Sequence, residues 1–191
     1  EALPQFFHLA ESDLAWISKC RGAHNRLGFA LQLTTVRYLG TFLEDPTEVP
    51  WTVLQNLGRQ LAIGDLACVQ GYRTSERRWD HAAEIRAKGG YRDFTDPAIA
   101  LSFVRWLYAV CWTGTDQPSI LFERSKDWML AQKILLPGVT VLEKFVARLR
   151  SRVAAHLYHR LCRGVTEEQR TRLEALLAVP QGRRGSLLDQ L

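Results

Sequence analysis

"HNRLGFALQLTTVRYLGTFL", residues 24–43, has apolar side chains on two opposite faces when it is wound as an α-helix. At about 100° per residue, one face carries Leu27, Leu31, Thr34, Tyr38 and Phe42, and the opposite face carries Phe29, Leu33, Val36 and Leu43. A helix with this pattern is covered on both sides. The stretch therefore predicts a central, buried helix with other helices packed around it.

The sequence that follows carries further helix signals. Residues 44–50, EDPTEVP, break the chain, and helices are expected over 51–63 and 65–71, on either side of a turn in QLAIGDL. Thr74 or Ser75 is placed to cap another helix, which runs to Lys88 and stops at Gly89-Gly90. This arrangement of a turn between short helices predicts a helix-turn-helix-like unit.

The second half of the chain shows the same periodicity. Asp96 followed by Pro97 is a start signal for a helix that reaches residue 112. Helices are expected over 118–133 and 139–163, with KILLPGV between them as a second compact turn. Thr166 and Gln169 form a capping box for a helix over 167–178. Because no stretch alternates like a strand, the predicted fold class is all-α, with two small helical modules.

Composition favours an anionic partner. The 191 residues carry 25 Lys and Arg against 20 Asp and Glu, a net charge of +5 with a pI near 9.2. The four cysteines, Cys20, Cys68, Cys111 and Cys162, have no metal-ligand or redox spacing, so reduced and mostly buried thiols are expected. No apolar run reaches the roughly 18 residues of a membrane span, and no signal peptide opens the sequence. We therefore expect no membrane contact and a cytoplasmic location.

The basic excess belongs to two of the expected helical segments. Residues 71–92 carry six basic and three acidic residues, and residues 141–163 carry six basic residues and one acidic residue. On helix 139–163 an apolar stripe that includes Leu142 and Val146 lies opposite Lys144, Arg148 and Arg152. A one-sided basic helix is the footprint expected of nucleic-acid binding. A charged face that is merely solvated is the ordinary alternative for each helix.

The helix expected over 74–88 also has an inner apolar face and an outer basic face. Trp79, Ala82 and Ala83 are expected to face inward, and Arg77, His81 and Lys88 are expected to share the outer face. Trp106 and Trp128 also lie on apolar faces, so core packing is expected for them.

Motifs of catalysis are missing from the sequence. It contains no phosphate-binding glycine loop, no dinucleotide-binding motif and no zinc-protease motif. His156, His159 and Cys162 have a spacing that could ligate a metal, but only two of the three share a helix face well and no fourth ligand is near. No metal, no other cofactor and no catalytic residue is therefore predicted.

Several blocks of the sequence resemble a known family. HNRLGFALQL, RYLGTFL and DPTEVP resemble the beginning of the class II replicative transposases of the Tn3 type, as does YRTSERRWDHAAEIR following LGRQLAIGDL. ILFERSKDWMLAQKILLPGVTVLEKFVARLRSR and HRLCRGVTEEQRTRLEALL are similar to the next two blocks of that family, in the same order. The resemblance covers roughly residues 6–178. The sequence departs from the family pattern at TSERRWDH, where it has Trp79.

The resemblance implies a function. In this family the N-terminal region is helical and binds the terminal inverted repeats of the transposon, and a separate downstream domain carries the acidic catalytic triad. None of the triad residues matches a position here, so the resemblance implies a segment that is not itself an enzyme. It implies duplex DNA as the partner, self-association through the full-length transposase, and a bacterial, nucleoid-associated protein.

The complete prediction has three parts along the chain: a DNA-binding module over 1–92, a second one over 93–178, and a flexible tail or linker over 179–191. The residues expected to contact DNA are Arg73, Arg77, Arg78, His81, Arg86, Lys88, Arg92, Lys144, Arg148, Arg150 and Arg152. Three alternatives are a stand-alone DNA-binding regulator, a helical domain that binds an acidic protein, and an independent nuclease. The nuclease is disfavoured because no metal-binding acidic cluster is apparent in the sequence.

Overall fold

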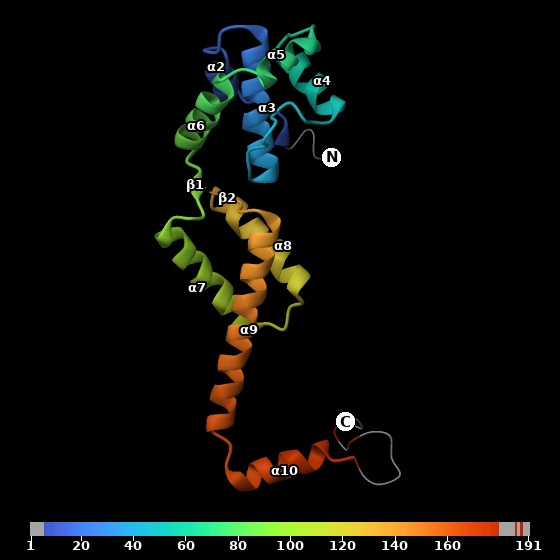
Figure 1. The fold of residues 1–191 in the computed structure, drawn as a ribbon, viewed down its shortest axis with the longest axis vertical. Coiled ribbons are helices and arrows are strands. Elements are labelled where there is room, and N and C mark those ends of the chain that lie inside the picture. The colour runs from blue at the N-terminus through green and yellow to red at the C-terminus, as the bar shows by residue number, and fades with distance from the viewer. Residues whose placement is uncertain (1–5, 180–185, 187, 189–191) are drawn as a thin grey trace.

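The computed structural model describes residues 6–179, 186 and 188, and within these it is predominantly helical. The elements in chain order are α2 (Glu11–Ile17), α3 (Ala23–Leu39), α4 (Trp51–Gln60), the 3-10 helix η1 (Leu66–Val69), α5 (Gln70–Arg73), α6 (Arg77–Gly89), β1 (Arg92–Asp93), α7 (Pro97–Thr113), α8 (Pro118–Ala131), β2 (Ile134–Leu135), α9 (Val139–Arg163) and α10 (Glu167–Leu177). The predicted all-α class is confirmed. Figure 1 shows two helical lobes stacked along the long axis, with α9 continuing below them.

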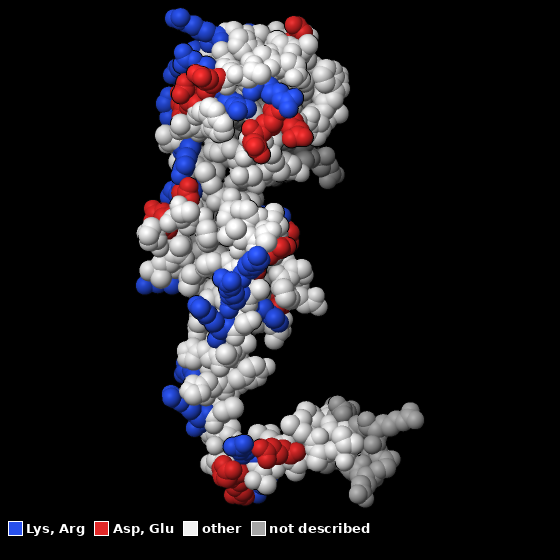
Figure 2. Space-filling model, viewed as in Figure 1, with Lys and Arg blue, Asp and Glu red and all other residues white. Residues whose placement is uncertain are grey.

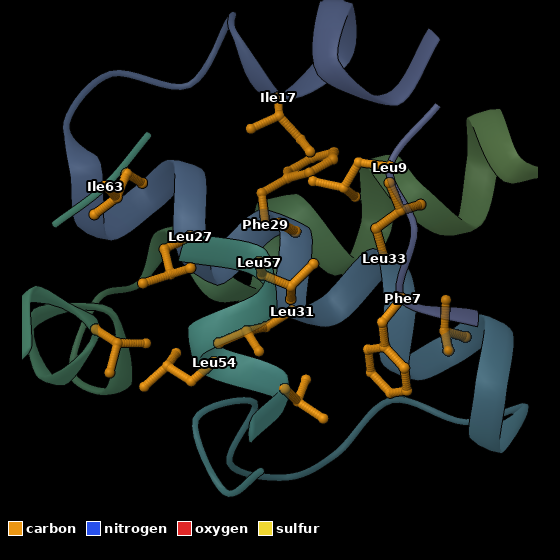
Figure 3. Close-up of a cluster of buried hydrophobic side chains, with 14 of the residues drawn as sticks. Phe7, Leu9, Ile17, Leu27, Phe29, Leu31, Leu33, Leu54, Leu57 and Ile63 are labelled. Carbon is orange, nitrogen blue, oxygen red and sulfur yellow. The ribbon is translucent and has the colours of Figure 1, made fainter. Parts of the chain in front are cut away.

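The first lobe is built around α3, as the apolar pattern predicts. Every residue from Leu27 to Val36 is buried, so both faces of α3 are covered. Side chains from α2, α4 and the segment before α2 close around it (Figure 3). Gly28 lies against Tyr72, and a Cβ at this position would come 2.2 Å from the Tyr72 ring. The glycine therefore lets α5 approach α3 closely.

A bidentate ion pair ties α2 to α3 at the edge of this core. The Arg37 guanidinium donates to both carboxylate oxygens of Asp13, at 2.6 and 2.8 Å. Burial would raise the pKa of Asp13, but the hydrogen bonds from Arg37 and from the Ala10 N–H hold it below its ordinary value. The buried carboxylate stays charged because its partners replace the water it has lost.

The second lobe consists of α7, α8 and the first half of α9. Phe103 and Leu107 of α7, Leu121 and Met129 of α8, and Leu142 and Val146 of α9 form its buried core. Trp106 and Trp128 stack on each other with ring centroids 5.2 Å apart and are partly buried, which confirms their predicted core packing. The Asp96 side chain accepts from the Ala98 N–H and Pro97 occupies the first turn, so the predicted start of α7 is also confirmed.

Two very short strands join the lobes, and the sequence did not predict them. β1 pairs in parallel with β2, with Arg92 opposite Ile134. Around this pair, the Lys133 ammonium donates to the Gly89 carbonyl at 3.0 Å, and the Leu136 N–H donates to the Gly40 carbonyl at 2.8 Å. Two residues per strand are too few to show an alternating pattern in a sequence.

The C-terminal half of α9 and all of α10 extend beyond the two cores. The Thr166–Gln169 capping box begins α10 as predicted, yet α10 has no buried residue. Figure 1 shows α10 turning away from the end of α9. The division into modules over 1–92 and 93–178 stays a prediction. Of the predicted tail, residues 180–185, 187 and 189–191 lie outside the described residues.

Candidate nucleic-acid interface

Helix α9 presents three basic side chains on one exposed face. Lys144, Arg148 and Arg152 stand four residues apart, so they follow one another along the helix. Leu142 and Val146, on a different face, are buried in the second core and fix the rotation of the helix. We call Lys144, Arg148 and Arg152 the α9 basic face.

A groove between α9 and α7 runs beside this face. Its lining residues are Val104 of α7 and Val141, Lys144, Phe145, Arg148, Leu149 and Arg152 of α9. Apolar side chains thus alternate with cations, whose aliphatic stems can lie on the apolar surface while their charged ends reach water. Such a surface can pack against sugar rings and bind phosphates. The contribution of Val104 comes from another helix, so no pattern within residues 139–163 could have revealed the groove.

The α9 basic face has no carboxylate partner. Among the described residues, no ion pair includes Lys144, Arg148 or Arg152. Figure 2 shows Lys and Arg side chains gathered over the middle of α9, with few acidic side chains beside them in that view. An anion that binds there displaces water only and breaks no ion pair.

Arg150 is exposed but does not belong to this face. It is two residues from both Arg148 and Arg152, which places it on the other side of α9. Its charge acts on Cys111 of α7: burial raises the pKa of the Cys111 thiol, and Arg150 partly offsets that rise. Arg150 therefore lies on a different face of α9 from Arg148 and Arg152, and its contact with DNA stays a prediction.

The basic side chains around α6 are arranged differently. Arg73 lies 2.8 Å from an Asp45 carboxylate oxygen, Arg86 lies 2.7 Å from one of Asp93, and Lys88 lies 2.5 Å from one of Glu84. Asp45 is distant in sequence, in the loop between α3 and α4. Each of these three exposed cations therefore has a carboxylate partner within the first lobe or at its edge.

The three remaining arginines of this region have individual surroundings. The Arg92 guanidinium donates to the Gln132 carbonyl at 3.0 Å and so helps to join the lobes. Arg77 is 70% exposed, and its nearest carboxylate, Asp80, is 3.5 Å away and equally exposed. Arg78 donates to the Arg73 carbonyl at 3.0 Å and has no ion pair within the described residues.

His81 is buried, so the prediction that it shares an outer face with Arg77 and Lys88 is wrong. Only 8% of His81 is exposed, and its Nδ1 lies 2.9 Å from the Tyr72 hydroxyl. Burial lowers the pKa of His81, although the nearby carboxylates of Glu84 and Asp80 oppose that change. The imidazole is a fixed part of the contact between α6 and α3 and is not available to DNA.

Trp79 is exposed, so the prediction that it faces inward is also wrong. It is 61% exposed and stands on the opposite side of α6 from His81 and Ile85. Ala83 is exposed as well. The His81 imidazole, whose partner is the buried Tyr72 hydroxyl, therefore occupies the inward-facing position that the apolar pattern predicted for Trp79.

The histidine and cysteine positions on α9 show no metal-binding arrangement in the described part of the chain. No group of three or more His, Cys, Asp or Glu there is close enough to hold a metal ion. His156 instead lies with its Nδ1 2.6 Å from the Tyr108 hydroxyl of α7. The four cysteines are free thiols, as expected, but Cys20, Cys68 and Cys111 are only partly buried and Cys162 is exposed, so the expectation of mostly buried thiols is wrong. Among the residues that the structure describes, no helix is both long and apolar enough to cross a membrane.

Known proteins resemble this chain over nearly its whole length. The transposase for transposon gamma-delta of Escherichia coli K12 is 38% identical over 190 residues, which are 99% of this chain and 19% of that protein. The transposase for Tn1546 of Enterococcus faecium is 29% identical over 175 residues, 92% of this chain and 18% of that protein. The transposase for Tn501 of Pseudomonas aeruginosa is 27% identical over 185 residues. The chain spans about a fifth of the length of these relatives.

The family described as "Domain of unknown function (DUF4158)" matches residues 1–149, which contain both helical cores and the beginning of the α9 basic face. The expected similarity to Tn3-type transposases is confirmed. The chain belongs to the DUF4158 family.

Proposed function

We propose that this chain binds duplex DNA at the terminal inverted repeats of a transposon, and that the α9 basic face makes its main phosphate contacts. The observation that carries the proposal is the row of Lys144, Arg148 and Arg152, exposed and without ion pairs among the described residues. The similarity to transposases supports the choice of transposon DNA as the partner. Arginine and lysine bind phosphate through charge-assisted hydrogen bonds, which fix the position of a protein on the duplex.

In this proposal, the cutting and joining of DNA are carried out by regions of the transposase relatives that this chain does not match. Incubation of the chain with a plasmid carrying a transposon end, with Mg²⁺ or Mn²⁺ present, should leave the plasmid intact. Nicking that persists after repurification would contradict this part of the proposal.

Specific binding can be tested with two duplexes, one carrying the terminal repeat and one with the same bases scrambled. We expect a preference on the order of 10³ at moderate salt, as is usual for specific binding. A footprint should map the protected bases. Equal affinity for the two duplexes, or displacement of the repeat by polyglutamate as readily as by duplex DNA, would overturn the proposal.

A triple variant tests the α9 basic face. K144A/R148A/R152A should weaken binding on the order of 100-fold, and the slope of log K against log salt should decrease by about 0.9 for each lost phosphate contact. The control is R124A/K126A/R170A, which removes the same net charge. In the control, each cation is paired with a carboxylate, of Asp116, Glu123 and Glu174 respectively. Equal losses for the two variants would overturn the assignment of the main contact to α9.

A further inference from the structure

The last ten residues of α9 project beyond both hydrophobic cores. Val153 is the last buried residue of the helix, and from Ala154 to Arg163 every side chain is partly or fully exposed. Figure 1 shows this part of α9 continuing past the end of α7. We call residues 154–163 the α9 arm. Helices in proteins are stabilised mainly by packing against a core, which the arm lacks, so its exposed sides are available to a partner.

Two contacts with α7 fix the directions in which the side chains of the α9 arm point. The Nδ1 of His156 lies 2.6 Å from the Tyr108 hydroxyl, and the Arg160 guanidinium lies over the Trp112 ring, 5.6 Å from its centroid. The rings of Tyr108 and Trp112 are themselves stacked, with centroids 5.8 Å apart. The rotation of the arm about its own axis is therefore set by α7, and Arg160 is directed toward α7.

His159 and Arg163 continue the α9 basic face along the arm. At about 100° per residue, both lie within about 20° of Arg152 around the helix axis. Both side chains are exposed, and neither takes part in an ion pair among the described residues. The cations of the arm are therefore in line with those of the second lobe, on one side of one unbroken helix.

The α9 basic face and the arm lie in a stretch of sequence without acidic residues. Residues 144–166 contain six Lys and Arg, two His and no Asp or Glu. An exposed helix that is merely solvated often mixes both signs of charge, as α10 does with its two i, i+4 ion pairs. A long row of unpaired charges of one sign is instead suited to a polyanion.

We infer that the α9 arm lies along the DNA duplex, and that His159 and Arg163 bind phosphates beyond those bound by the α9 basic face. This inference rests on the proposed function and extends the interface from the second lobe onto the arm. From Arg152 to Arg163 the helix rises by about 17 Å, at about 1.5 Å per residue. That length corresponds to about five base pairs of duplex at about 3.4 Å each. Phosphate contacts of this kind position the protein without reading a base.

The first test compares the affinities of R163A and R172A for the terminal-repeat duplex. Each variant removes one positive charge from an exposed arginine, but Arg172 is paired with Glu168 on α10 at 2.7 Å. We expect R163A to bind roughly 3- to 10-fold more weakly, with a salt slope lower by about 0.9, and R172A to stay within about twofold of the unsubstituted chain. H159A/R163A should weaken binding further. Equal affinities of R163A and R172A would overturn the inference.

Shortened duplexes test where the arm lies. Removing about five base pairs from one end of the protected site should weaken binding by the unsubstituted chain and change that by H159A/R163A much less, because the same contacts are lost only once. If the shortening and the substitutions weaken binding additively at both ends of the site, the arm does not lie along the duplex.

Controls separate a DNA contact from a protein contact and from a role in folding. Leu161 is 60% exposed and lies two residues from Arg163, on the opposite side of the arm, so L161A should bind DNA as the unsubstituted chain does. Thermal unfolding of R163A should be unchanged, because the arginine is exposed and alanine favours helix. If L161A loses as much affinity as R163A and also dissociates a dimer in sedimentation, the arm is an interface between copies and the inference is wrong. Failure of the unsubstituted chain to bind the repeat would instead overturn the proposed function.

Discussion

The α6 and α9 regions have similar numbers of basic residues but differ in how those residues are engaged. Around α6, Arg73, Arg86 and Lys88 each lie within 2.5–2.8 Å of a carboxylate oxygen. On α9, Lys144 and Arg148 have no such partner among the described residues. A paired cation must give up its carboxylate before it can bind phosphate, whereas an unpaired one exchanges only water. The charge count of the α6 region is therefore larger than its number of cations without a carboxylate partner.

Helix α6 is attached to the first core through the buried contact between Tyr72 and His81, and the largest expected effect tests this attachment. Replacing Tyr72, which is fully buried against Gly28 and bonded to His81, with Ala should destabilise the fold by about 3–5 kcal/mol. Y72F keeps the ring and loses only the hydroxyl, so about 1–2 kcal/mol is expected. Chemical unfolding measures both. A cost below about 1 kcal/mol for Y72A would show that α6 is not anchored through this residue.

The buried imidazole gives the α6 attachment a dependence on pH. Because burial lowers the pKa of His81 in the folded state, the unfolded chain binds the proton more readily. Stability from this group is complete above the ordinary histidine pKa of about 6.5 and falls as the pH drops from there toward the lowered pKa of the folded state. Unfolding of the unsubstituted chain and of H81Q should be compared between pH 7.5 and 5. A slope over this range that H81Q does not reduce would exclude His81 as its source.

Removing the carboxylate charges that face Lys88 and Arg86 should make α6 more similar to α9 in its number of unpaired cations. E84Q/D93N removes the charges that face Lys88 and Arg86 and keeps the oxygens that accept from Trp16 and Thr95. Affinity for duplex DNA should rise by about 3- to 10-fold, with a steeper salt slope. Unchanged affinity would mean that pairing is not what keeps these cations from DNA.

The smallest effect is expected when the paired cations themselves are removed. R73Q/R86Q/K88Q should weaken duplex binding by less than about threefold, since these side chains already have partners. Binding titrations beside the α9 triple variant measure the difference. If the two triple variants lose affinity equally, the contrast between the regions is wrong.

Much of the fold could be predicted from local patterns. The double apolar pattern of residues 24–43 identified α3 as the central helix, and the range 139–163 predicted for α9 agrees with the structure. The cap at Asp96, the capping box at Thr166 and the stop at Gly90, whose backbone is left-handed, are also as predicted. These signals are local, since a cap or a stop depends on residues within one turn of the helix end.

The sequence by itself determined where the helices lie and where the positive charge is concentrated. Only the tertiary structure decided which side of α6 faces inward, which cations are paired, and that Val104 completes the groove beside α9. Helical periodicity fixes the angles between residues on one helix, but it does not fix how that helix is rotated against its neighbours. That rotation followed from the contacts of His81 with Tyr72, just as the pairing of Arg73 followed from Asp45, a residue 28 positions away in the chain.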